Sequence, residues 1–379
     1  MTEVQITNTP AVELVNVAGQ TVAQAVQFRK MAVVKRIDAI DPIPDADAIE
    51  VATVGGWKVV VKKGEFQPGQ LAVYCEIDSW IPTEIAPYLS KGPVPREYEG
   101  IKGERLRTVK LRGQVSQGLL LPVFNDDTGV YIMVMDEEDG EYSVTVTEGE
   151  DVSDALGIVK YEPPMPASMA SDAKGYFPPF IPKTDQERIQ NLPAELAFWQ
   201  DKDFTWEVTE KLAGASMTAD LNEDQLGVCS RRLELKMNPD NTLWKVAIRE
   251  KLEDKLRHAC CNWALQGEII GEGIQGNKYK VKGQQFYIFD VYCIDQRRYL
   301  TPDERADFVA LWKMAHVPVF QRKFKLTGLT IADLLQKAES KSVMGVLPAP
   351  EQEGHVYKCN ECEASFKVIS NKFLLKNGD

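Results

Sequence analysis

The chain has 379 residues, which is long enough for two domains with separate hydrophobic cores. Hydrophobic residues make up 44% and charged residues 26% of the sequence, a globular balance that argues against a disordered chain. The net charge of −12 does not exclude a nucleic-acid partner, because residues 126–154 hold eleven acidic residues and no basic one, which leaves −1 for all other residues. Residues 96–112, by contrast, hold six basic and three acidic residues, which predicts a local basic surface beside a solvated acidic loop or hairpin.

The sequence also bears on the compartment of the protein. Since no stretch of about 18 uncharged apolar residues occurs, we expect no membrane-spanning helix and no membrane partner. A basic segment followed by an apolar one is missing from the N-terminus, so we expect no secretory signal. The seven cysteines are too few and too scattered for a disulfide scaffold, and a cytoplasmic protein with reduced thiols is expected.

The N-terminal part of the sequence predicts a small antiparallel β-barrel. Residues 1–29 are polar and weakly patterned, and we expect either an extension or a short docking helix around residues 12–28. From Met31 onward, short runs rich in Val, Ile, Tyr and Trp alternate with turn signals. Such spacing is typical of a barrel, so residues 30–157 are assigned to an OB-like domain. The expected strands are Met31–Ile37, Ile49–Thr53, Trp57–Lys62, Gln70–Ile77, Leu106–Leu111 and Gly118–Val123.

A change of composition near Tyr161 indicates a second domain. Several prolines and aromatic residues predict a linker at residues 158–183, and residues 184–379 form the second domain. Strands and helices alternate there, so the expected fold class is α+β, with antiparallel sheets and flanking helices. The expected strands are Phe204–Glu210, Ser216–Leu221, Gln225–Ser230, Leu265–Gly271, Gln285–Ile294 and Gly354–Lys358.

Three helices are expected in the second domain. Thr184 and Glu187 are spaced as in a capping box, which predicts a helix over Asp185–Asn191. The pattern predicts further helices over Thr242–Gln266 and Pro302–Lys313.

Six short motifs follow one another in this second domain. In the first motif an expected strand delivers Lys211 into a turn that contains Gly214. Each motif alone is a weak signal, but six in one order are a strong one. The motifs are Lys211-Leu-Ala-Gly214, Cys229-Ser-Arg231-Arg232, Gln266-Gly-Glu268, Phe286-Tyr-Ile-Phe289-Asp290, Glu353-Gly-His-Val356-Tyr-Lys358 and Ser365-Phe-Lys367.

This order resembles the covalent nucleotidyltransferases, which include DNA ligases, RNA ligases and mRNA capping enzymes. Three longer runs, Phe180–Arg188, Gly267–Lys280 and Ser365–Lys376, are similar to those of ATP-dependent RNA ligases with an added N-terminal OB domain. The resemblance covers residues 31 to 379. Few residues follow the last lysine motif, so we expect no C-terminal OB domain of the kind that capping enzymes and typical DNA ligases carry, and this favours the RNA ligases.

The resemblance implies a reaction that starts at Lys211. The lysine attacks the α-phosphate of ATP to give lysyl–AMP, AMP passes to an RNA 5′-phosphate, and a 3′-hydroxyl then attacks that end. Attack needs an unprotonated amine, and a free lysine is almost wholly protonated at neutral pH. We therefore expect burial near other cations to lower the pKa of Lys211.

The resemblance also assigns roles around the lysine. Arg231 would hold ribose or phosphate, Glu268 would accept a ribose hydroxyl, and Phe289 would stack on adenine. The amines of Lys367 and Lys358 would neutralise charge on the α-phosphate. A divalent Mg²⁺ or Mn²⁺ would be organised by Glu353 through water, because hard oxygen ligands suit these ions. The candidate catalytic residues are Lys211, Lys367 and Glu353, and the candidate nucleotide-binding residues are Glu210, Lys211, Arg231, Glu268, Phe289, Glu353, Lys358 and Lys367.

One position departs from the family pattern. The lysine motif of the family is K-x-D-G, and Ala213 stands where the aspartate is expected. Alanine offers no polar group, so a second hypothesis is a nucleic-acid-binding protein whose nucleotidyltransferase fold has impaired catalysis. Because every other motif is present, the enzyme is favoured.

Two further expectations concern RNA and zinc. Phosphate contacts dominate nucleic-acid binding, so the basic residues 96–112 are expected to bind RNA, with ends or nicks in a duplex as the substrate. Cys359 and Cys362 have the spacing of zinc ligands, but a structural site needs four ligands. The sequence has no second C-x-x-C pair, and the further candidate ligands are His258, Cys260 and Cys261, so an ordinary hairpin turn is favoured over a zinc site.

Overall fold

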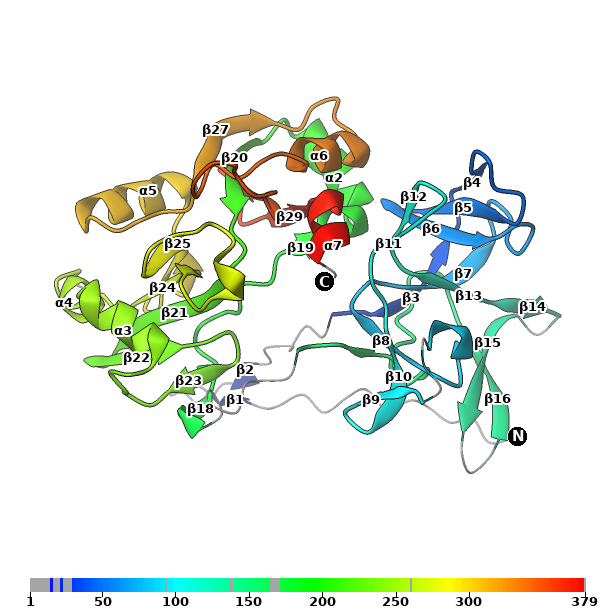
Figure 1. Ribbon diagram of the computed structural model, residues 1–379, viewed down its shortest axis with the longest axis horizontal. Coiled ribbons are helices and arrows are strands. Elements are labelled where there is room, and N and C mark those ends of the chain that lie inside the picture. Colours follow the sequence, from blue (N-terminus) through cyan, green and yellow to red (C-terminus); the bar gives the residue numbers. More distant parts are fainter. Residues whose placement is uncertain are drawn as a thin grey trace.

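The computed structural model describes residues 14–15, 21–22, 29–90, 92, 94–127, 129–136, 140–163, 171–259 and 261–377. Two domains lie side by side, the N-terminal domain on the right of Figure 1 and the C-terminal domain on the left. Both are built mainly from antiparallel sheets, and the α-helices with assigned bounds all belong to the C-terminal domain (Figure 1). Among the helices of these described ranges, none has the length and apolar content needed to cross a bilayer.

The N-terminal extension is not helical where it is described. Strands β1 (Leu14–Val15) and β2 (Thr21–Val22) pair in antiparallel fashion. The helix expected around residues 12–28 is therefore wrong at these four residues, and its other residues lie outside the described ones.

Short strands with alternating burial build the N-terminal domain. In β6, Trp57, Val59 and Val61 are buried whereas Lys58 and Lys62 are exposed, so one face of the strand meets the core. Three sheets have the strand orders β13-β7-β3, β4-β5-β6 and β17-β8-β10-β9. The bounds are β3 (Ala32–Arg36), β4 (Ala39–Pro42), β5 (Ile49–Val54), β6 (Trp57–Lys62), β7 (Leu71–Cys75), β8 (Ser79–Pro82), η1 (Pro87–Leu89), β9 (Arg96–Tyr98), β10 (Ile101–Arg105), β11 (Val109–Leu111), β12 (Gln114–Ser116), β13 (Leu119–Pro122), β14 (Phe124–Asp126), β15 (Gly129–Asp136), β16 (Gly140–Thr145) and β17 (Val159–Lys160).

Two features of this domain bear on the sequence expectations. The strand expected over Leu106–Leu111 is only β11, which pairs with β12 in a separate hairpin, whereas β13 pairs with β7. A tight turn at Arg112-Gly113 closes that hairpin before β13 begins, and both turn residues have positive φ. The acidic segment forms the hairpin of β15 and β16, and β16 is mostly exposed, as expected for a solvated acidic hairpin.

Two sheets form the C-terminal domain. Their strand orders are β18-β23-β22-β21-β24-β25-β26 and β19-β29-β28-β20-β27, and β19 and β29 run parallel. Large apolar side chains fill the space between sheets and helices, with Trp206, Tyr357 and Phe366 among the fully buried ones. The strand bounds are β18 (Ala173–Tyr176), β19 (Glu187–Arg188), β20 (Thr205–Lys211), β21 (Ala215–Asn222), β22 (Gln225–Cys229), β23 (Leu233–Leu235), β24 (Trp263–Gly271), β25 (Gln284–Cys293), β26 (Arg298–Tyr299), β27 (Val319–Lys325), β28 (Gly354–Cys359) and β29 (Ser365–Ile369).

The helices differ from expectation in two places. Residues 185–191 are not an α-helix, because β19 pairs with β29 and only the 3-10 turn η2 (Ile189–Asn191) follows. The helix expected over Thr242–Gln266 is broken, since Lys251 adopts a left-handed conformation with φ of 53° and the segment beyond residue 262 is the central strand β24. The helix bounds are α2 (Pro193–Asp201), α3 (Thr242–Arg249), α4 (Leu252–Arg257), α5 (Pro302–Leu311), α6 (Ile331–Ala338) and α7 (Asn371–Asn377), with a 3-10 turn η3 (Gln275–Asn277).

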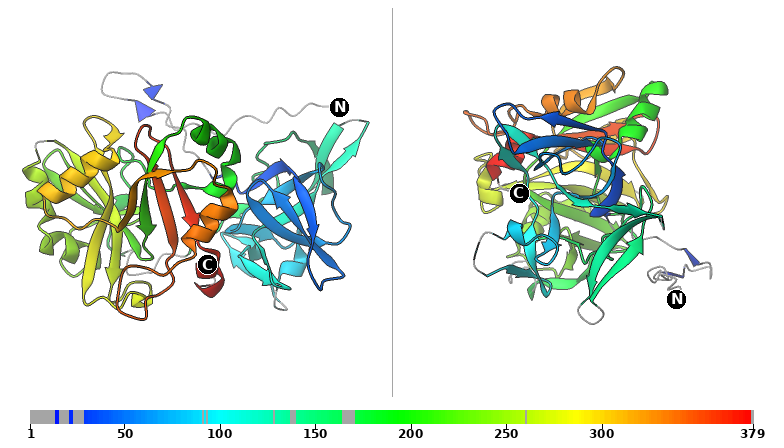
Figure 2. Two further views of the ribbon diagram at one scale, coloured as in Figure 1. Left: turned by 90° about the horizontal axis from the view of Figure 1, so that it is seen from above. Right: turned by 90° about the vertical axis from the view of Figure 1, so that its right-hand side faces the viewer.

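The C-terminal helix joins the two domains. Figures 1 and 2 show α7 at the junction between them. Leu374 of α7 and Ile369 of β29 pack in one hydrophobic cluster with Trp57 and Val54 of the N-terminal domain. Burial of these side chains stabilises the contact through the hydrophobic effect.

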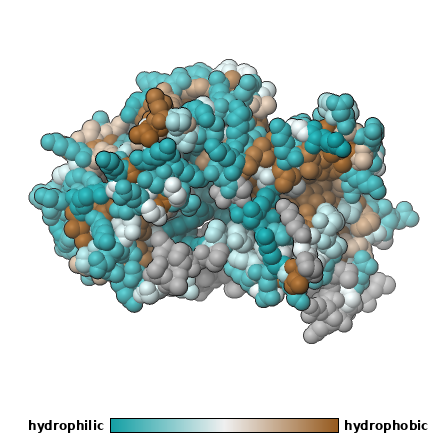
Figure 3. All heavy atoms as spheres, in the orientation of Figure 1, coloured by the Kyte–Doolittle hydropathy of each residue, from teal (hydrophilic) through white to brown (hydrophobic). Residues whose placement is uncertain are grey.

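The face of the molecule shown in Figure 3 is mostly hydrophilic, and its larger hydrophobic patch lies on the N-terminal domain.

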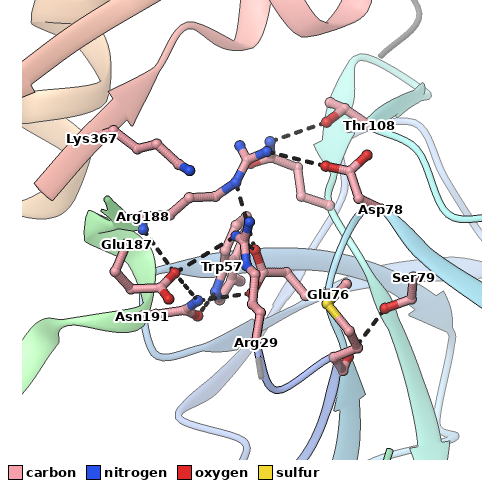
Figure 4. Close-up of polar contacts among 12 residues, drawn as sticks. Arg29, Trp57, Glu76, Asp78, Ser79, Thr108, Glu187, Arg188, Asn191 and Lys367 are labelled. Atoms are coloured by element: carbon pink, nitrogen blue, oxygen red, sulfur yellow. Dashed lines mark hydrogen bonds and ion pairs between the residues drawn. The ribbon is translucent and has the colours of Figure 1, made fainter. Parts of the chain in front are cut away.

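A buried polar network strengthens the same junction (Figure 4). The side-chain amide of Asn191 donates to Glu76 at 2.8 Å, and its oxygen accepts from the Trp57 indole at 2.6 Å. The guanidinium of Arg188 lies 3.6 Å from Glu76 and 3.5 Å from Asp78. Since Arg188 is the register partner of Lys367, this network ties the N-terminal domain to the last lysine motif.

Candidate active site

The first lysine motif forms a rigid turn between two central strands. Lys211 ends β20, and β21 begins at Ala215. A Cβ atom on Gly214 would lie 2.3 Å from the carbonyl oxygen of Ile269, so only glycine fits this close approach. The Ala213 N–H donates to the Tyr279 hydroxyl at 2.7 Å, and the Gly214 N–H donates to the Glu268 carboxylate at 3.0 Å. These contacts hold Lys211 at a defined place.

Two carboxylates surround the Lys211 amine. Its Nζ forms an ion pair with Glu353, which directly precedes Gly354, the register partner of Lys211. Burial by itself would lower the pKa of Lys211, but the charges of Glu353 and Glu268 outweigh burial, and the pKa is raised above its ordinary value. The expectation of a lowered pKa is therefore wrong for this arrangement, because the nearest partners are anions.

Glu268 belongs to the same site. Burial raises the pKa of the Glu268 carboxyl to about 7, whereas the positive charge of Lys211 acts to lower it. Its hydrogen bond to Gly214 is a structural role that sequence reasoning did not foresee, and its expected contact with a ribose hydroxyl stays a prediction.

A second cluster of charges surrounds Lys367. Its Nζ donates to the Asp185 carboxylate at 2.8 Å, and the same carboxylate lies 3.3 Å from Lys160 and 3.6 Å from Arg231. Burial alone would raise the pKa of Asp185, but these cations hold it far below its usual range. Burial lowers the pKa of Lys367 to about 8, and the charge of Arg188 adds to this effect, whereas Asp185 opposes it. Asp185 thus assembles three cations at one point.

Arg231 connects the two clusters. Its side chain is 61% exposed and lies next to Asp185, while its charge also lowers the pKa of Lys211 and of Glu268. The expected role of Arg231 in holding a ribose or a phosphate stays a prediction.

Lys358 and Phe289 lie together, and Lys358 pairs with Asp290, while its expected role at the α-phosphate stays a prediction. Its Nζ donates to the Phe289 carbonyl at 2.5 Å and to the Asp290 carboxylate, and it sits 5.7 Å from the centre of the Phe289 ring. Burial lowers the pKa of Lys358 to about 8, although Asp290 opposes this shift. The half-buried Phe289 ring packs against a cluster that includes Ala213 and Leu212, so the ring is close to the lysine turn.

Glu210 is buried beside the lysine turn. Its Oε2 accepts from the Val343 N–H at 3.2 Å, whereas its Oε1 is buried and has no hydrogen-bond partner among the described residues. Burial raises the pKa of Glu210 above its usual value. A buried oxygen without a partner is an acceptor that a bound donor group would satisfy, in keeping with its expected role in nucleotide binding.

Several site residues were missed by sequence reasoning. Asp185 lies in a run that looked like a helix start, and no spacing signal marks it as a partner of Lys367. Arg305 is fully buried and contacts Glu207, lies 3.5 Å from Asp290 and donates to His316 at 3.0 Å, so it supports the partner of Lys358. Such contacts join residues far apart in the sequence and leave no local pattern.

The two spaced cysteines, Cys359 and Cys362, lie at the turn between β28 and β29. Cys359 ends β28, and its N–H donates to the Ala364 carbonyl at 2.9 Å across the turn to β29. Within the described residues, no group of three or more His, Cys, Asp or Glu side chains could hold a metal ion. The antiparallel pairing of β28 with β29 forms the expected hairpin turn.

Two family models match the chain. A model described as an OB-fold domain matches residues 31–123, and a model described as RNA ligase matches residues 204–369. The expected order of an OB-like domain followed by a nucleotidyltransferase domain is confirmed, while the expected limits of the domains stay predictions. No curated protein matches the sequence.

Solved structures of a Naegleria gruberi RNA ligase are similar to most of the chain. A variant with AMP and Mn is 41% identical with a TM-score of 0.79, and the match covers 91% of this chain and 98% of that one. A variant with ATP and Mn is 41% identical with a TM-score of 0.80, and the match covers 93% and 100% of the two chains.

Proposed function

The chain belongs to the RNA ligase family, and we propose that it seals RNA with ATP through an AMP adduct on Lys211. The observation that carries the assignment to Lys211 is its place at the end of β20, facing Glu353 and Glu268, in a turn fixed by two backbone hydrogen bonds. The relatives with bound ATP and AMP support the same reaction.

In the first step, the transfer of AMP to Lys211, one bond forms and one bond breaks. Lys211 loses its extra proton to solvent, and its nitrogen forms a bond to the α-phosphorus of ATP while the bond to pyrophosphate breaks. The cations near Asp185, which include Lys367 and Arg231, are placed to bind the anionic phosphates. Phe289, packed beside the lysine turn, offers a ring for the adenine, and the partnerless Glu210 oxygen offers an acceptor.

The two later steps return the lysine to its free state. An oxygen of the RNA 5′-phosphate attacks the lysyl–AMP phosphorus, which breaks the P–N bond and forms a phosphoanhydride. A 3′-hydroxyl then attacks the activated 5′-phosphate, and AMP leaves. We propose ends or nicks in duplex RNA as the substrate, because the basic stretch at residues 96–112 lies on the OB domain.

A divalent cation fits the residues around Lys211. Carboxylate oxygens are the ligands that Mg²⁺ and Mn²⁺ prefer, and Glu353 and Glu268 both act on the lysine amine. Glu353 would hold such an ion, through water, with Glu268 beside it. When bound, the ion supplies positive charge that offsets the charge of the phosphates.

The proposal is tested by covalent labelling. The protein is incubated with α-labelled ATP and a divalent metal salt, run on a denaturing gel, and mapped by peptide mass spectrometry. We expect label on Lys211, no label in Lys211→Ala, and full label in Lys245→Ala, which removes an exposed lysine of α3. Label on another lysine would overturn the assignment to Lys211, and RNA binding without any label would favour the impaired binding protein.

A further inference from the structure

A small pocket opens on the OB domain outside the site described above. Its volume is about 330 Å³, and it is lined by side chains of β8, β9 and β10 together with residues just beyond β10 and β17. This volume is at the lower end of the range for small-molecule sites, which suits one nucleotide rather than a helix. The lining residues are Trp80, Arg96, Glu97, Arg105, Arg107 and Tyr161.

The lining combines cations with aromatic rings. Three arginines and one glutamate give the pocket a net positive lining. The rings of Trp80 and Tyr161 stack with centres 5.7 Å apart, and the Arg105 guanidinium lies over the Tyr161 ring. Guanidinium groups bind phosphates, and aromatic or guanidinium planes accept stacked bases, so this combination is the chemistry that recognises a nucleotide.

One arginine is fixed in place before any ligand arrives. Arg105 donates to Asp78 from two nitrogens, at 3.1 and 2.6 Å, and its guanidinium lies 4.9 Å from the centre of the Tyr161 ring. Only 12% of its side chain is exposed. A guanidinium held by an ion pair and a ring offers its plane to a ligand at little entropic cost.

The pocket is connected to the candidate active site by two routes. Tyr161 follows Lys160, whose amine lies 3.3 Å from Asp185, the partner of Lys367. Asp78, which holds Arg105, lies 3.5 Å from Arg188, and Figure 4 shows Arg188 between Asp78 and Lys367. The pocket is therefore linked through Lys160 and Asp78 to the cations around Lys367.

We propose that this pocket binds one nucleotide of the RNA strand beside the end that is sealed. Arg107 and Arg96 hold its phosphate, and its base or ribose packs against Arg105 and Tyr161. That the bound strand is RNA rests on the proposed function. A pyrophosphate or the phosphates of ATP share the phosphate chemistry, but neither uses the aromatic base of the pocket as a nucleoside does.

The test measures RNA binding directly, without ATP and with a chelator present. Fluorescence anisotropy of a short single-stranded oligoribonucleotide with a 5′-phosphate gives Kd at several salt concentrations. For Tyr161→Ala we expect Kd to rise about 5-fold or more, because the ring that holds Arg105 in place against the base is lost, with Tyr161→Phe near the wild type. For Arg107→Ala we expect the slope of log K against log salt to fall by about 0.7, the value for one lost phosphate contact on a single strand.

The matched control is Arg36→Ala, an arginine on β3 of the same domain that pairs with Glu148 and is 50% exposed. It should leave Kd and the salt slope unchanged, and thermal melting of every variant checks the fold. An unchanged Kd in both Arg107→Ala and Tyr161→Ala would overturn the proposal. It would also be overturned if pyrophosphate or ATP displaced the labelled RNA as well as unlabelled RNA does. Failure of the proposed function shows separately, because it removes the label on Lys211 without affecting this binding assay.

Discussion

Arg188 and Lys367 are register partners in the parallel pair of β19 and β29. Arg188 reaches across the junction to Glu76 and Asp78 of the OB domain, while Lys367 binds Asp185 beside the candidate active site. A shift of the OB domain would move Arg188 and, through the shared backbone, the position of Lys367. The two domains are therefore coupled at the residue expected to bind phosphate.

The pH dependence of ATP binding should show the titration of Lys367. The pKa of Lys367 is lowered to about 8, chiefly by burial, so its amine is charged below that pH and neutral above it. We expect ATP binding to weaken as the pH rises through 8. In Lys367→Arg the side chain stays charged, because the pKa of arginine exceeds about 12. The measurement is the Kd for ATP over a pH range of about 6.5 to 9.5. An equal loss of ATP binding with rising pH in both proteins would exclude Lys367 as the cause.

Glu353→Gln should impair labelling and change its metal dependence. The amide keeps an acceptor near Lys211 but loses the charge that suits a divalent cation. Residues that hold a metal indirectly, through water or another ligand, typically contribute about 10–100-fold to metal affinity or activity. We therefore expect the labelling rate to fall by a factor of that size. The rate of label transfer is measured against Mn²⁺ concentration, with Glu361→Gln, in the turn between β28 and β29, as the control. A slower rate with an unchanged metal midpoint would show that Glu353 does not bind the metal.

Tyr279→Phe should destabilise the lysine turn. The Tyr279 hydroxyl, which is buried, accepts from the Ala213 N–H at 2.7 Å. Removing it leaves a buried N–H without a partner, which costs about 1–3 kcal/mol. We expect a lower free energy of unfolding in urea and slower labelling of Lys211. The control Tyr176→Phe changes a tyrosine that is 89% exposed, and an equal effect in both variants would contradict this role.

Ala213→Asp should raise the rate of sealing. In the family pattern an acidic group two positions after the lysine is available to orient the nucleophile, and Gly214 keeps the turn that such a residue needs. One organising group in such a site contributes about 10²–10³ in rate. A third carboxylate near Lys211 also raises the lysine pKa, so the adenylylation and sealing rates are measured separately. If neither rate changes, position 213 has no organising role.

The order of the domains and the turn at the lysine motif were predictable from local sequence patterns. Strands such as β5, β6 and β7 were predicted because alternating apolar residues between turn signals are a local pattern. The motifs at Lys211, Glu268 and Glu353 were likewise predicted from residue types in order, and the structure brings these three together.

Tertiary structure alone decided the charges around these residues. Residues 185–191 have a local pattern of helix capping, but pairing of β19 with β29 turns Asp185 toward Lys367 instead. The pKa of Lys211 rises rather than falls because its neighbours come from β24 and from the residue before β28. Electrostatic interactions depend on distance in space, and the sequence separation of 142 residues between Lys211 and Glu353 carries no such information.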